Sequence, residues 1–114
     1  MRALAHSLSV AVLALGLLAL PRAGATAQEF GDAEAGRDFA REVCATCHAV
    51  EGGDSVSPHP AAPTFRAVAD VPGMTAMALF VILRNPHRQM PDLILTRDEL
   101  HDVAAYILTL KGRD

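Results

Sequence analysis

Hydrophobic and polar positions along the chain predict a helix at each end of one domain. From Asp32 onward, apolar or small residues recur at helical spacing, and Asp32 itself can cap the first helix. The stripe consists of Ala35, Gly36, Phe39, Ala40 and Val43.

The last helix has the clearest signals. Thr96 and Glu99 match a capping box, and Gly112 is suited to end the helix. The apolar stripe consists of Leu100, Val103, Ala104, Ile107 and Leu110. His101 lies opposite this stripe, so we expect it to be a surface residue.

Between these helices, the pattern predicts a loop, a short turn and one further helix. Residues 51–60 are rich in Gly, Pro and Ser, which indicates a loop, and residues 65–69 can form a short helical turn. Residues 74–84 are apolar almost all round, so we expect a helix that is buried on most sides and ends at Asn85-Pro86. We find no strand-like alternation. The predicted fold class is all-α, with three main helices plus a short helical turn.

The N-terminus has the features of a secretory signal peptide. Arg2 precedes a largely apolar run over residues 8–20, and two small-residue cleavage patterns follow, ending at Ala25 and Ala27. The run is short for a membrane span. We therefore expect a signal peptide over residues 1–27, one domain over residues 28–114 and a periplasmic location. An uncleaved N-terminal anchor is the alternative, and only then would the protein be attached to a membrane.

The predicted mature protein is acidic. The whole chain has a formal charge of −3, and removal of Arg2 and Arg22 leaves eight basic residues against thirteen acidic ones, a charge of −5. Lys111 is the only lysine. This balance argues against a nucleic-acid partner, because nucleic-acid binding depends on basic residues that neutralise phosphates. A ring of docking lysines cannot be built from this chain.

The candidate chemistry centres on Cys44-Ala45-Thr46-Cys47-His48. Two thiols at this spacing, followed at once by an imidazole, form the pattern for covalent attachment of a c-type haem. Each thiol can add to one haem vinyl group, and His48 is then positioned to ligate the iron. Two alternatives use the same cysteines: a thioredoxin-like dithiol, which requires βαβ units around the motif, and a plain short-loop disulfide.

From about Asp32 to Leu110, the sequence resembles the small bacterial class I cytochromes c. The residues that carry the resemblance are Gly36, Phe39, the Cys44–His48 motif, Ala62-Pro63-Thr64-Phe65, Met90-Pro91 and Tyr106-Ile107. The resemblance implies one covalent haem c with its iron, attached outside the cytoplasm. It also implies that Gly36 lets the terminal helices cross closely, with Phe39 and Tyr106 as an aromatic pair beside the crossing. The carbonyl of Pro63 would accept a hydrogen bond from His48, although Pro63 as a simple loop stiffener is an alternative.

The resemblance implies Met90 as the second iron ligand, opposite His48. A thioether stabilises ferrous iron, so His/Met ligation raises the reduction potential. His87 is the competing ligand and would give a bis-His haem of lower potential. We expect Met74 and Met77 to be core residues and His59 to be solvated.

The predicted function is single-electron transfer in the periplasm. If His48 and Met90 both bind the iron, no position is open for a substrate, so we expect a carrier that is not an enzyme and has no small-molecule substrate. Its partners would be redox proteins. Three alternatives stay open: a haem-based ligand binder or sensor with a displaceable Met90, a thiol–disulfide oxidoreductase that uses Cys44 and Cys47, and a haem subunit permanently bound to a larger redox enzyme.

Overall fold

The computed structural model describes residues 30–85, 89–90 and 93–112. The predicted signal peptide and its cleavage patterns lie outside the described residues. The described part contains helices and no strand, so the all-α prediction is confirmed.

The first helix begins where the sequence predicts, and it changes character before it ends. The carboxylate of Asp32 accepts hydrogen bonds from the backbone N–H groups of Glu34 (2.9 Å) and Ala35 (3.2 Å), which starts α1 (Ala33–Phe39). The chain continues directly into η1 (Ala40–Cys44), a π-helical turn in which the Ala45 N–H donates to the Ala40 carbonyl five residues earlier (2.9 Å). Nothing in the hydrophobic spacing indicated this wider turn, which ends at Cys44.

Three further helices complete the domain. The short α2 (Phe65–Ala69) has Thr64 as its N-cap. The helix predicted from Met74 begins later, as α3 (Ala76–Arg84), because the Thr75 hydroxyl caps it by accepting from the Ala78 N–H. The capping box of Thr96 and Glu99 is present at the start of α4 (Arg97–Thr109).

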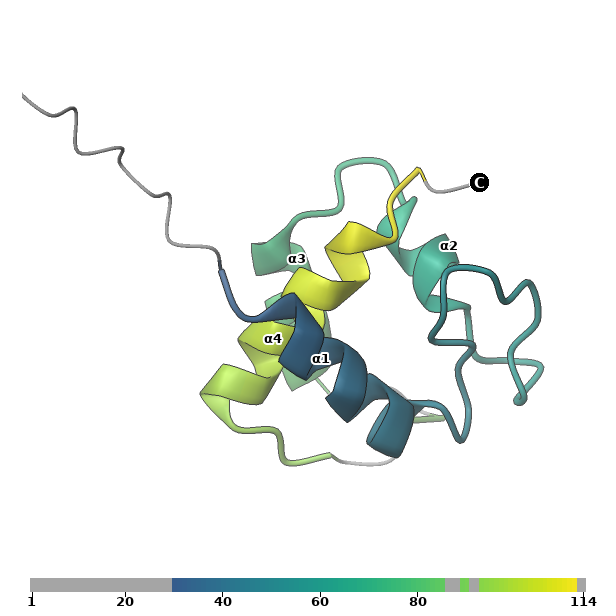
Figure 1. Ribbon diagram of the computed structural model, residues 1–114, viewed down its shortest axis with the longest axis horizontal. Helices are drawn as coiled ribbons and strands as arrows, with labels where there is room; N and C mark the ends of the chain where they lie inside the picture. The colour runs from purple at the N-terminus through teal and green to yellow at the C-terminus, as the bar shows by residue number, and fades with distance from the viewer. Residues whose placement is uncertain (1–29, 86–88, 91–92, 113–114) are drawn as a thin grey trace, which may run out of the picture.

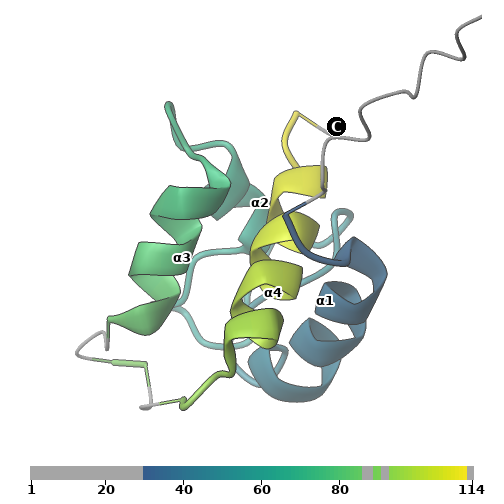
Figure 2. The same ribbon diagram turned by 90° about the vertical axis from the view of Figure 1, so that its left-hand side faces the viewer.

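The terminal helices cross at Gly36. Helix α4 lies in the middle of the bundle, with α1 against one side and α3 against the other (Figures 1 and 2). A Cβ atom at Gly36 would lie 2.0 Å from the Asp102 carbonyl oxygen of α4, so only glycine permits this approach. The expected close crossing is confirmed. The expected Phe39–Tyr106 pair is wrong: among the described residues, Tyr106 makes its ring contact with Phe65 (6.5 Å between centroids).

The expectation that α3 is buried on most sides is also wrong. Only Leu79 of this helix is fully buried, whereas Met77 and Val81 are 60% and 51% exposed. Helix α3 is at the edge of the bundle and turns one side to α4 and the other outward (Figure 2). No helix in the described ranges is both long enough and apolar enough to cross a membrane.

Candidate haem site

A cavity of about 370 Å³ lies between the attachment motif and helices α2, α3 and α4. Its walls are mainly apolar, and they also contain the sulfur and imidazole groups that the sequence analysis identified as candidate ligands. The apolar walls include Val43, Phe65, Val68, Leu79, Ile82, Leu83, Leu93 and Ile107, and the chemically distinctive side chains are Cys44, Cys47, His48, His59 and Met90. Ligand sites of this kind combine apolar walls with a few placed polar groups.

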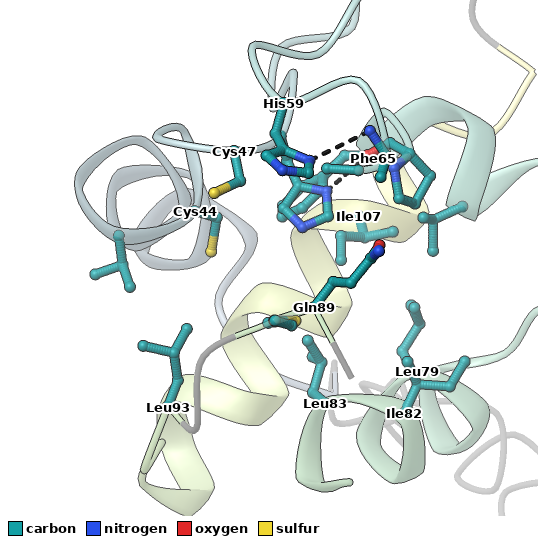
Figure 3. A pocket seen from close by; sticks show the side chains of 17 residues that line it. Cys44, Cys47, His59, Phe65, Leu79, Ile82, Leu83, Gln89, Leu93 and Ile107 are labelled. Carbon is teal, nitrogen blue, oxygen red and sulfur yellow. Dashed lines mark hydrogen bonds between the residues drawn. The ribbon is translucent and has the colours of Figure 1, made fainter. Parts of the chain in front are cut away.

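Cys44 and Cys47 are brought to the same side of the cavity. Cys44 ends the π-helical turn η1, and backbone bonds from the Cys47 and His48 N–H groups to the Cys44 carbonyl (3.2 and 3.0 Å) make the next turn compact. Both side chains line the cavity on the side away from Leu79 and Leu83 of α3 (Figure 3). The two thiols are not paired with each other. Burial raises the pKa of the Cys44 thiol to about 11.

His48 is held in one tautomer by the loop before α2. Its Nδ1 lies 2.7 Å from the carbonyl oxygen of Pro63. Because a carbonyl can only accept, Nδ1 must carry the hydrogen, and in the neutral ring Nε2 keeps the free lone pair that a metal requires. The Phe65 ring packs beside the imidazole, with centroids 5.5 Å apart. This is the contact that the resemblance implies for Pro63.

The segment after His48 is anchored by contacts that the sequence analysis did not predict. The Ala49 N–H donates to the buried Ser57 hydroxyl (3.0 Å), and the Ala49 carbonyl accepts from the Phe65 N–H (2.9 Å). The Tyr106 hydroxyl donates to the carbonyl of Val50 (2.8 Å). These bonds attach the motif to the loop, to α2 and to α4.

Glu51 adds an ion-pair cluster to this anchor. Its carboxylate accepts from the guanidinium groups of Arg37 (2.8 Å) and Arg41, which project from α1 and η1. The hydrogen bond from Arg37, assisted by Arg41, lowers the pKa of Glu51. The partners are ten and fourteen residues apart in sequence, so no local pattern could have indicated the cluster.

Among the candidates for the opposite side of the cavity, Met90 is half-buried and contributes to the wall. Met74 and Met77 do not line the cavity; Met74 packs against the core, but the prediction that Met77 is a core residue is wrong. His87, the competing ligand, and Pro91 lie outside the described residues.

Of the other two histidines that the structure describes, His59 is exposed as expected and His101 is not. His59 is exposed, but it also lines the cavity, and its backbone N–H donates to the Cys47 carbonyl (3.1 Å). His101 is half-buried, which corrects the surface prediction. Its ring stacks on Phe30 with centroids 4.1 Å apart and meets the edge of Phe80 at 5.2 Å.

The residues of the cavity fit a flat, largely apolar macrocycle that contains a metal. Two thiols lie on one edge, an imidazole with a free Nε2 lies on one wall, a thioether is available in the lining, and leucine, isoleucine and phenylalanine side chains supply apolar surface. A soft sulfur and an imidazole nitrogen are both ligands of haem iron.

The comparisons with known proteins agree with this arrangement. Residues 31–107 match the family described as "Cytochrome C oxidase, cbb3-type, subunit III". The chain is also 40% identical over 80 residues to cytochrome c-552 of Bradyrhizobium diazoefficiens, an alignment that covers 70% of this chain and 76% of that protein. No solved structure matches the chain. The chain therefore belongs to this cytochrome family, as a small bacterial c-type cytochrome with the all-α class I fold, one covalently bound haem c and a role in electron transfer.

Proposed function

We propose that the protein is a periplasmic carrier of single electrons whose haem is attached through Cys44 and Cys47 and whose iron is ligated by His48 and Met90. One observation supports this best: a single cavity contains both thiols, an imidazole with its Nε2 free and a thioether. When bound, the haem supplies one-electron exchange between ferric and ferrous iron.

Each residue contributes a distinct property to this proposal. The hydrogen bond from His48 Nδ1 to Pro63 orients the imidazole and increases the basicity of its other nitrogen. Met90 supplies a soft sulfur that favours ferrous iron and so raises the potential. The apolar side chains of α3 and α4 exclude water from the macrocycle. If His48 and Met90 both held the iron, no ligand position would be open to a small molecule, which is why we propose a carrier that is not an enzyme.

The periplasmic location rests on the sequence of residues 1–27, which has the composition of a signal peptide. Purification of the exported protein and sequencing of its N-terminus would test both the location and the boundary before residue 28. An N-terminus at Met1 in a membrane fraction would favour the uncleaved anchor.

The thiol–disulfide alternative is disfavoured by the surroundings of Cys44. Enzymes of that class need a thiolate with a lowered pKa, and burial here raises the pKa of Cys44 to about 11. Free-thiol titration of exported protein separates the two readings, since thioether-linked cysteines do not react. Carbon monoxide binding by the ferrous protein at neutral pH would instead support a ligand sensor.

The distal ligand is the first property to test. We expect Met90→Ala to remove the weak far-red absorption band of methionine-ligated ferric haem and to lower the reduction potential, because the iron loses its soft ligand. His87→Ala is the matched control and should retain the band. A Met90→Ala protein with an unchanged spectrum would contradict the proposed ligation.

The description of the matched family names a subunit of an oxidase, so a permanently bound subunit is a second form of the same function. The free carrier and the bound subunit would both transfer electrons, and they differ only in whether the protein is part of a larger complex. Size-exclusion chromatography of the native protein, extracted in mild detergent, distinguishes a free carrier of about the mass of the chain from a component of a large complex.

A further inference from the structure

A second cavity, of about 450 Å³, lies between α3 and the start of α4. It is lined by Phe80, Arg84, Leu95, Arg97 and Leu100. We call it the arginine groove. The two cavities are lined by residues that are close in sequence. Leu83 and Leu93 line the haem cavity, whereas Arg84 and Leu95 line the groove.

The two arginines of the groove differ from the other arginines that the structure describes in α1, η1 and α2. Arg37 and Arg41 pair with Glu51, and Arg66 pairs with Asp70. Within the described ranges, Arg84 and Arg97 have no carboxylate partner. In a chain with an excess of acidic residues, two guanidinium groups without carboxylates therefore meet in one hollow.

The nearby carboxylates do not line this hollow. Glu99 accepts hydrogen bonds from the backbone and hydroxyl of Thr96, and neither Glu99 nor Asp98 contributes to the lining. Arg97 is the first residue of α4, where the positive end of the helix dipole adds to its charge. An anionic group entering the groove would meet positive charge from both sides.

A column of rings holds Arg84 in place. Its guanidinium lies 5.4 Å from the centroid of Phe80, Phe80 meets the ring of His101 edge-on at 5.2 Å, and His101 stacks on Phe30. A guanidinium that is already ordered loses less side-chain entropy when it binds a carboxylate.

Exposed apolar side chains lie on the same two segments of the chain that form the groove. Met77, Val81 and Arg84 recur at helical spacing along the outward side of α3, and Met77 and Val81 are more than half exposed. Ile94, next to Leu95 of the lining, is fully exposed. Exposed aliphatic side chains together with arginines are typical of protein–protein interfaces, which have an apolar centre and are enriched in arginine.

We infer that the arginine groove and the outward side of α3 form the docking surface for an acidic redox partner, a protein that presents carboxylates beside apolar side chains. The inference rests on the proposed function, because only a carrier requires such a partner. The two arginines without carboxylate partners favour an occupant that presents carboxylates, and a second copy of this chain is one of the outcomes of the test below.

Adsorption of the haem-loaded protein to a chemically defined surface tests the inference. The probe is gold coated with a mixed monolayer of carboxylate- and methyl-terminated alkanethiols, and the adsorbed mass is read with a quartz-crystal microbalance at low salt. We expect wild type to adsorb despite its net negative charge, and Arg84→Gln/Arg97→Gln to lower its affinity about tenfold. Lys111→Gln removes a positive charge elsewhere and should have little effect. Val81→Ser should weaken adsorption, whereas Val56→Ser, an equally drastic change at another exposed valine, should not.

Equal losses in the arginine and lysine variants, or no loss in either, would overturn the inference. Arginine-dependent sedimentation with phosphatidylglycerol vesicles would overturn it in favour of a lipid surface, and arginine-dependent dimerisation in sedimentation equilibrium would overturn it in favour of a second copy. Because adsorbed mass does not depend on electron transfer, failure of the proposed function is scored separately, by titrating the same proteins with small redox mediators in solution.

Discussion

At the scale of single residues, the chain after the attachment motif is held by side chains that bond to backbone. His48 bonds to the Pro63 carbonyl, Ser57 accepts from the Ala49 N–H, and Tyr106 donates to the Val50 carbonyl. Such bonds fix the direction of a loop that has no regular secondary structure of its own. These three bonds therefore position the His48 imidazole although no helix or strand contains this residue.

The bond from Tyr106 provides a test of this anchoring. Tyr106→Phe keeps the ring and leaves the buried Val50 carbonyl without its donor, so we expect a loss of about 1–2 kcal/mol in the free energy of unfolding. Denaturant unfolding of the haem-loaded protein, followed by circular dichroism, measures it. Thr109→Val removes a hydroxyl that bonds within its own helix, at the Tyr106 carbonyl (2.7 Å), and should change stability by less than about 0.5 kcal/mol. Equal stability of Tyr106→Phe and wild type would contradict the anchoring role.

The residues of the attachment motif were identified from their spacing because the chemistry itself dictates that spacing. Pro63 could be named only through the family resemblance, since its carbonyl is backbone and has no side-chain signal. Ser57 and Glu51 were missed because each acts on groups that are distant in sequence. Sequence reasoning thus found the groups that would bind the cofactor, and, apart from Pro63, it did not find the groups that hold them in place.

At the scale of elements, the crossing of α1 and α4 organises the bundle. It depends on Gly36, whose missing side chain lets the α1 backbone reach the Asp102 carbonyl. The same contact region also contains the N–H of Asp32, which donates to the Asp102 carboxylate (2.7 Å) and joins the start of α1 to α4.

Enlargement of Gly36 should therefore separate the two helices. In Gly36→Ala the new methyl group would overlap backbone atoms that cannot rotate away, so we expect destabilisation of about 1–3 kcal/mol despite the better helix propensity of alanine. Gly53→Ala is the matched control, because nothing lies within 4 Å of a Cβ at that position. Thermal unfolding of both variants gives the comparison, and an unchanged Gly36→Ala would argue against a close crossing.

The cluster around Glu51 predicts how α1 and η1 respond to acid. The pKa of Glu51 is lowered in the folded protein by its hydrogen bonds from Arg37 and Arg41, so its contribution to stability is complete above the unfolded value of about 4.3. That contribution disappears as the pH falls through the lower folded pKa. We expect Glu51→Gln to be less stable at pH 7 and to lose less further stability on acidification than wild type.

Denaturation midpoints between neutral and strongly acidic pH check this prediction. Glu42→Gln, which changes the formal charge equally at an exposed position with no ion pair among the described residues, should follow wild type. Parallel pH profiles for Glu51→Gln and wild type would show that the cluster does not contribute.

Helix starts were predicted well where a cap lies next to a periodic stripe, as at Asp32 and Thr96. The Thr75 cap was overlooked because the apolar run appeared to begin before it, at Met74. The π-helical turn could not be predicted, since the apolar stripe alone does not distinguish it from an α-helical turn. The exposure of α3 was misjudged because an apolar composition does not say whether the second side of a helix faces protein, cofactor or partner.

At the scale of the whole molecule, the cofactor is expected to be part of the core. Apolar side chains of α2, α3 and α4 line the cavity of about 370 Å³. A haem in this cavity would therefore be a common packing surface for the three helices. A domain of this size supplies little stability from its protein core alone and commonly depends on a covalent or metal staple.

A protein without haem should therefore be largely unfolded. We expect Cys44→Ala/Cys47→Ala to show far-ultraviolet circular dichroism with much less helix than the haem-loaded wild type, because the shared packing surface cannot be retained without covalent attachment. Cys47→Ala alone keeps one point of attachment and should fall between the two. Native helix content in the haem-free double variant would refute the idea that haem completes the core.

The most direct test of the account is a spectroelectrochemical titration of the exported, haem-loaded protein. We predict a single reversible one-electron transition, with low-spin spectra in both oxidation states and no change when carbon monoxide is present at neutral pH. A ferrous spectrum that shifts on addition of carbon monoxide, or a protein that shows no reversible transition, would contradict the proposal that this cytochrome carries single electrons on an iron held by His48 and Met90.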